Sequence, residues 1–177
     1  LPTNVYPLFA NALRKEENKS AKTHLKECSD LFSEFSKIAA DNPLSWFPTY
    51  RSSEEISEVT PDNRMIGFPY TKYLNSIIRV NMSSAFILVS QKKADELNIP
   101  NSKRIYVHGC SILDDIWNVT ERPNFHSSPA IKKCVTQTLD EAEISLSDIK
   151  YFDFYSCFPS AVQIAKKELG IPREKKD

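Results

Sequence analysis

Three side chains that could do chemistry follow one another at residues 155–157: the phenol of Tyr155, the hydroxyl of Ser156 and the thiol of Cys157. They come directly after a strand-like aromatic run at residues 151–154 and before a helix-like run. A fixed hydroxyl donor stabilises negative charge that develops on an oxygen, and an ionised thiol is a nucleophile. The pattern therefore predicts a reactive site at a strand-to-helix turn, where a buried parallel strand ends at Phe154 and the bend after it aims residues 155–157 into a cavity. The alternative is that Tyr155 is a core aromatic residue and Cys157 is a packed structural thiol.

The spacing of histidines and cysteines predicts no metal site, because the four cysteines form no C-x-x-C pair and the three histidines are scattered. His108 ends a strand-like run before Gly109 and is a candidate to line a cleft. We interpret His24 and His126 as surface or structural residues. The cysteines are interpreted as free thiols in a reducing compartment, which favours a cytoplasmic location.

Composition excludes several classes of function. With 3 glycines in 177 residues, the chain cannot build the glycine-rich phosphate loop of a P-loop or dinucleotide-binding protein. Basic and acidic residues are equal at 23 each, and the lack of a basic excess argues against nucleic-acid binding. No apolar run approaches the roughly 20 residues that span a bilayer, and the first residues, LPTNVYPLF, do not resemble a signal peptide.

The elements that would position these residues alternate between helix and strand in the second half of the chain. Apolar residues at helical spacing and local start and stop signals predict helices near the N-terminus, from Ser20 to Pro43, at 92–97, from Ser128 and from Pro159 to Gly170. Apolar or aromatic runs predict buried strands at 84–90, 104–108 and 151–154. Residues 44–69 have no regular period and are predicted to form an extended connection. This alternation is typical of an α/β sheet.

The run SPAIKKCVTQTLDEAEISLSDIKYFDFYSCFPSAVQIAKKELGI resembles the thiolase superfamily, particularly its sterol-carrier-protein-type branch and acetyl-CoA acetyltransferase-like members. The segments PYTKYLNSIIRVNMSSAFILVSQKKADEL and YPLFANALR are similar to the same branch. The resemblance implies a partial thiolase-like α/β fold, with a helical loop region followed by β-α-β-α elements of a mixed sheet. It assigns residues 1–68 to the helical loop region and 69–177 to the α/β region, at the end of one half and the start of the next.

The resemblance also implies that the chain is an internal piece, because the family's nucleophilic cysteine and its glycine-rich loop with histidine would lie outside it. It further implies roles for individual residues. At the position of Tyr155 the family carries a residue that orients a water toward the thioester oxygen. Cys157 and Phe158 match one family pattern, whereas Tyr155 and Ser156 depart from it. In the family, the residues at the positions of Asn81, Ser83 and Ser84 lie near the pantetheine arm of coenzyme A. His108 and Phe158 are further candidates for binding the cofactor.

Two classes of function follow from this resemblance and stay open at this stage. The first is a thiolase-like acyl-CoA acyltransferase of the acetyl-CoA acetyltransferase type, inactive as an isolated piece. Its substrate would be a coenzyme A thioester, with no tightly bound cofactor, and its partners would be copies of itself or completing chain segments. The second is a non-catalytic thiolase-like protein that binds acyl-CoA, lipid or another protein. The departures at Tyr155 and Ser156 favour the second, and the match at Cys157 and Phe158 favours the first.

Overall fold

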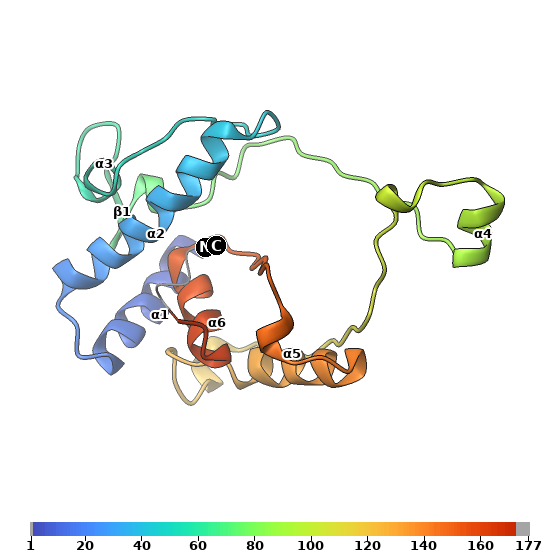
Figure 1. The fold of residues 1–177 in the computed structure, drawn as a ribbon. Coiled ribbons are helices and arrows are strands. Elements are labelled where there is room, and N and C mark those ends of the chain that lie inside the picture. Colours follow the sequence, from blue (N-terminus) through green and yellow to red (C-terminus); the bar gives the residue numbers. More distant parts are fainter. Residues whose placement is uncertain (1, 173–177) are drawn as a thin grey trace.

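The computed structural model of the chain describes residues 2–172, whose regular secondary structure is mainly α-helix (Figure 1). The α-helices are α1 (Pro2–Glu16), α2 (Ala21–Asp41), α3 (Ser53–Ser57), α4 (Gln91–Glu96), α5 (Pro129–Ala142) and α6 (Pro159–Leu169). Single turns of 3-10 helix lie in the connections: η1 (Lys72–Leu74), η2 (Asn101–Lys103), η3 (Val119–Glu121) and η4 (Leu146–Asp148). Two short antiparallel strands, β1 (Met65–Gly67) and β2 (Tyr70–Thr71), pair with Met65 opposite Thr71 and Gly67 opposite Tyr70.

The predicted helices are confirmed, and local signals explain their ends. Ser20 caps α2 by accepting a hydrogen bond from the Thr23 amide at 3.0 Å. Gly170 ends α6 with a left-handed φ of 66°, which glycine adopts without steric cost. Ser128 stands directly before Pro129, where a serine is expected to cap the helix, but its hydroxyl donates to Asp115 at 2.6 Å and does not cap α5.

One apolar core joins α1, α2, α3 and α6 to the β-hairpin. Its buried members are Ala10, Cys28, Ile56, Tyr70, Leu74 and Phe158. The Tyr6 ring stacks on the Phe158 ring with centroids 4.3 Å apart, so the first helix packs directly on the start of the last. Both predicted regions, 1–68 and 69–177, contribute to this core, and the boundary between them stays a prediction.

The structure differs from the predicted mixed sheet. Residues 84–90, 104–108 and 151–154 are not paired as strands, and the β1–β2 hairpin is the sheet that residues 2–172 form. Two extended segments carry α4 away from the helical body and back (Figure 1). The apolar side chains of residues 85–89 and 105–107 are exposed, and Phe152 and Phe154 are half-buried, so this part of the prediction is wrong for the described chain. The physical reason is that a strand satisfies its backbone groups only through a neighbouring strand.

Residues 44–69 also differ from the expected irregular connection, since they contain α3 and β1. Ser52 and Glu55 form a capping box at the start of α3. The Asn63 amide donates to the carbonyls of Glu55, Ile56 and Glu58 at 3.0, 2.9 and 2.7 Å. One buried asparagine therefore holds the connection against the end of α3. No helix among residues 2–172 combines the length and apolarity needed to cross a membrane.

Candidate functional site

The turn formed by residues 155–157 brings the two predicted catalytic side chains together. The thiol of Cys157 donates to the hydroxyl oxygen of Tyr155 at 3.4 Å. This hydrogen bond and the charge of an ionised Cys157 raise the pKa of Tyr155 above its ordinary value. A phenol with a raised pKa stays protonated at neutral pH and keeps its capacity to donate a hydrogen bond.

The same turn lies on the surface. The Tyr155 side chain is 90% exposed, and Phe154 precedes it in a segment that is not a strand. The two hollows described below are lined by other residues. The expectation that a buried parallel strand aims Tyr155 and Cys157 into a cavity is therefore wrong for the described chain, and their catalytic role stays a prediction.

The backbone on the C-terminal side of the turn is firmly held. The Ser76 amide donates to the Cys157 carbonyl at 3.1 Å. Phe158 is buried between the rings of Tyr6 and Tyr70, with centroids 4.3 and 5.8 Å away. Phe158 thus serves the core in this structure, and its predicted contact with a cofactor is untested. The turn therefore combines a fixed start of α6 and a half-buried Cys157 with a freely exposed Tyr155 side chain.

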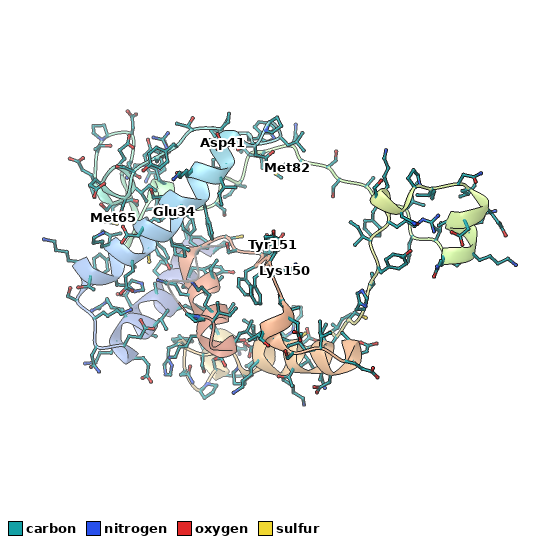
Figure 2. All side chains as sticks on the ribbon, viewed as in Figure 1. Glu34, Asp41, Met65, Met82, Lys150 and Tyr151 are labelled. Atoms are coloured by element: carbon teal, nitrogen blue, oxygen red, sulfur yellow. The ribbon has the colours of Figure 1, made fainter. Side chains whose placement is uncertain are left out.

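The residues predicted to approach the pantetheine arm lie on the extended segment after β2. Asn81, Ser83 and Ser84 are exposed. A shallow hollow of about 300 Å³ is lined by Val80, Asn81, Met82 and Ser83. The Trp46 indole donates to the Asn81 carbonyl at 3.1 Å, and this contact holds the segment near the C-terminal end of α2, where Figure 2 shows Met82 and Asp41.

His108 does not join the other predicted site residues. Its side chain is exposed on the segment that returns from η2 to α5. Among residues 2–172, no hydrogen bond, ion pair or ring contact connects it to Tyr155 or Cys157. The proposed cleft position of His108 stays a prediction.

A hollow of about 340 Å³ at the start of α5 was missed by the sequence analysis. Asp115 lies in its wall and binds Arg122 at 2.7 Å and the Ser128 hydroxyl at 2.6 Å. Burial raises the pKa of Asp115, but the hydrogen bonds from Ser128 and Arg122 outweigh it and lower that pKa overall. Lys133 brings a second cation to the rim. Arg122 and Ser128 lie 7 and 13 residues after Asp115 in the sequence. Helix or strand periodicity therefore does not reveal that the three side chains meet.

A thiol–imidazole pair lies in the core and is unreactive at neutral pH. His24 Nε2 is 3.6 Å from Cys28 Sγ, and the Gln163 amide nitrogen is 3.5 Å from the same sulfur. Burial raises the pKa of the Cys28 thiol to about 12 and lowers the pKa of His24. Both groups are therefore neutral at pH 7, and a thiol that does not ionise is a poor nucleophile. His24 is structural, in agreement with one of its two predicted roles.

All four cysteines are free, as predicted. Within the described range, 2–172, no cluster of three or more His, Cys, Asp or Glu side chains is placed to hold a metal ion.

Comparison with solved structures relates this arrangement to known proteins. The chain matches the crystal structure of a monomeric SCP2-thiolase like protein type 1 from Mycobacterium smegmatis with a TM-score of 0.83 and 31% sequence identity. The match covers 99% of this chain. The fold is thiolase-like. The chain spans 39% of the length of the Mycobacterium smegmatis protein. Comparisons with protein-family models and with curated proteins found no match.

The thiolase-like fold confirms the coarse part of the resemblance read from the sequence. The likeness extends from the first helix through α6, because it covers nearly the whole chain. The 155–157 turn therefore belongs to a thiolase-like framework, although the Tyr155 side chain is open to solvent.

Proposed function

We propose that this chain is part of a thiolase-like acyl-CoA acyltransferase of the acetyl-CoA acetyltransferase type. The observation that carries the proposal is the structural likeness to an SCP2-thiolase-like protein at a TM-score of 0.83 and 31% identity. The substrate is a coenzyme A thioester, and no tightly bound cofactor is required. The match of Cys157 and Phe158 to one family pattern supports the same function.

In this proposal the turn acts on the thioester carbonyl. The Tyr155 hydroxyl, or a water that it orients, donates to the carbonyl oxygen as negative charge develops there. The raised pKa of Tyr155 keeps the phenol protonated for this role. Cys157 fixes the position of the phenol through the 3.4 Å contact. Asn81, Ser83 and Ser84 receive the pantetheine arm, and His108 and Phe158 complete the predicted cofactor-binding set.

The isolated 177 residues are inactive in this proposal. The family's nucleophilic cysteine and glycine-rich loop have no counterpart in this chain, and Cys28, the thiol beside a histidine, does not ionise near pH 7. The similar protein is described as monomeric, which favours completing segments over a homo-oligomer.

A non-catalytic thiolase-like protein that binds acyl-CoA, lipid or another protein is the second candidate. Two observations favour it: Tyr155 is 90% exposed, and Tyr155 and Ser156 depart from the family pattern.

Acetoacetyl-CoA thiolysis, measured for the protein at its natural length and for the 177-residue chain, tests the proposal. We expect turnover in the first and none in the second. Tyr155→Phe should lower kcat by about 100-fold, whereas Tyr151→Phe, a matched exposed tyrosine, should leave it unchanged. Coenzyme A binding without turnover would support the second candidate. Turnover by the 177-residue chain that Cys157→Ala abolishes would contradict the proposal and make Cys157 a nucleophile.

A further inference from the structure

A second phenol lies beside the 155–157 turn and comes from the other end of the chain. The ring of Tyr6, on α1, stacks on the ring of Phe158 with centroids 4.3 Å apart and an angle of 19° between the planes. Phe158 directly follows Cys157, and Tyr6 and Cys157 pack against the same buried core. Tyr6 is therefore a neighbour of the Tyr155–Cys157 pair, although the sequence analysis assigned it no role.

The electrostatics of the three groups agree with this arrangement. Burial raises the pKa of Tyr6 above its ordinary value, and the charge of an ionised Cys157 raises it further. The hydrogen bond with Cys157 and the charge of its thiolate are the main causes of the raised pKa of Tyr155, and the charge of Tyr6 adds to them. Both phenols therefore stay protonated at neutral pH, where each can donate a hydrogen bond.

The hydroxyl of Tyr6 is available to a ligand. Within residues 2–172, no hydrogen bond uses it, whereas the Tyr70 hydroxyl in the same group of rings accepts from the Ser160 amide. A buried tyrosine hydroxyl usually has a hydrogen-bond partner. The Tyr6 side chain is half-buried, so an unused donor lies next to a hydrogen-bonded thiol and phenol.

The surroundings of Tyr6 fix the position of this donor. An added Cβ on Gly67 would lie 2.8 Å from the Thr3 carbonyl oxygen, so the start of α1 packs closely on the β-hairpin. The stacked Phe158 ring holds the Tyr6 ring, and rotation of a phenol about its long axis leaves the hydroxyl oxygen in place. A donor that is already in position needs no reorganisation when negative charge develops on its acceptor.

We propose that the Tyr6 hydroxyl is a second hydrogen-bond donor of the site and that, together with Tyr155, it binds the carbonyl oxygen of an acyl thioester. A carbonyl oxygen has two lone pairs, so both phenols can donate to the same atom. Free coenzyme A has no carbonyl oxygen at its thiol and should not engage Tyr6. The thioester identity of the acceptor rests on the proposed function, whereas the placement of Tyr6 beside Tyr155 and Cys157 does not.

The placement is tested in the 177-residue chain by nuclear magnetic resonance of ring-labelled tyrosine, which follows the titration of each phenol. Cys157→Ser should lower the pKa of both Tyr6 and Tyr155, because it removes the thiolate charge that raises them. Tyr73 is the matched control, since it also packs against the core but lies under Arg51 at 4.0 Å, and its titration should not change. A Tyr6 titration that ignores Cys157→Ser would overturn the placement and the proposal with it.

The donor role is tested by acetoacetyl-CoA thiolysis with the protein at its natural length. Tyr6→Phe keeps the ring and its stack on Phe158 but removes the hydroxyl, so kcat should fall by about 100-fold with little change in KM. A lost structural contact would instead lower stability, which urea unfolding of the same variant measures. Tyr73→Phe should leave both kinetic constants unchanged. An active protein whose kcat is insensitive to Tyr6→Phe would overturn the donor role and leave the proposed function standing.

A protein that binds coenzyme A thioesters without turnover is tested by calorimetry. Tyr6→Phe should weaken the binding of acetyl-CoA by at least about 3-fold and leave the binding of free coenzyme A unchanged. Equal effects on the two ligands would show that Tyr6 does not reach the acyl carbonyl. A protein that neither binds nor cleaves the thioester would remove the proposed function and the donor role together, and the Tyr6 titration would still report whether the phenol lies beside Cys157.

Discussion

The hydroxyl oxygen of Tyr70 accepts a hydrogen bond from the backbone amide of Ser160, 90 residues later in the chain, at 3.2 Å in a buried setting. Pro159 opens α6 and has no amide hydrogen, so Ser160 carries the first amide of the helix that needs an acceptor. The phenol on the hairpin therefore acts as an N-terminal cap for α6 and joins the two halves of the core. Burial raises the pKa of Tyr70, which keeps this hydroxyl neutral.

Tyr70→Phe should destabilise the folded chain by about 1–3 kcal/mol, because it leaves the buried Ser160 amide without an acceptor. Urea unfolding followed by circular dichroism measures this free energy. Tyr151→Phe is the matched control, since Tyr151 is exposed on the segment before α6 (Figure 2), and its effect should stay within about 0.5 kcal/mol. Equal midpoints for the two variants would show that the Tyr70 bond contributes nothing.

Gly109→Ala should separate residues 109–111 from α5. A Cβ at this position would lie 2.5 Å from the Thr138 carbonyl oxygen and 3.3 Å from the Ala142 amide nitrogen. Both atoms belong to the backbone of a helix, so the segment has to move. We expect faster hydrogen exchange at residues 110–112 and an unfolding free energy lower by about 1–3 kcal/mol. Cys110→Ala changes the exposed neighbour and should do neither; unchanged exchange in Gly109→Ala would show that the close packing is absent in solution.

His24 should make stability depend on pH in the acid range. Burial lowers its pKa below the ordinary 6.5, and the nearby charges of Glu27 and Lys19 act in opposite directions. Below about pH 6.5 the unfolded chain takes up a proton that the folded chain still refuses, so the free energy of unfolding falls as pH falls. Above that pH the contribution is constant.

Urea unfolding at several pH values, from 7.5 down to the lowest pH at which the chain folds, checks this expectation. The measured quantity is the slope of the unfolding free energy against pH. His24→Gln should flatten the slope below about pH 6.5. His126→Gln is the control, because His126 is only partly buried and lies 3.8 Å from Glu16. If the His24→Gln variant keeps the same slope, the pH dependence of stability arises from other groups.

The cysteines should react with an alkylating reagent in an order set by burial. Cys110 is exposed and should be modified first, and Cys157 is half-buried and should follow. Cys28 is buried with a thiol pKa of about 12, so it should stay unmodified in the folded chain at pH 8. Mass spectrometry of peptides after timed exposure to iodoacetamide measures the order. Cys110→Ser should remove the fastest step, and rapid labelling of Cys28 without denaturant would contradict the burial.

The helices could be predicted from the sequence because their signals are local. The Ser20 hydroxyl caps α2 by accepting from the amide of Thr23, three residues later, and Gly170 ends α6 because glycine adopts the left-handed conformation. The 155–157 turn was also located correctly in the chain, immediately before α6. Its predicted cavity was wrong, since exposure depends on what covers a turn and not on its residues.

The strands were the main failure, and the reason is physical. Residues 84–90 have a strand-like sequence, yet strand formation requires a partner that supplies backbone hydrogen bonds and covers the faces. Such a partner is a property of the surroundings. The hollow around Asp115 was missed for a related reason, because its bonds to Arg122 and Ser128 have no periodic signature.

The sequence by itself determined the helices, the placement of free thiols along the chain and the thiolase-like character of residues 128–171, because these depend on patterns within a few turns or on a continuous motif. Only the tertiary structure decided that Tyr70 caps α6, that Phe158 belongs to the core and that His24 and Cys28 form a neutral buried pair. Contacts such as these join residues that local periodicity cannot relate, and burial then sets the charge state of the groups involved.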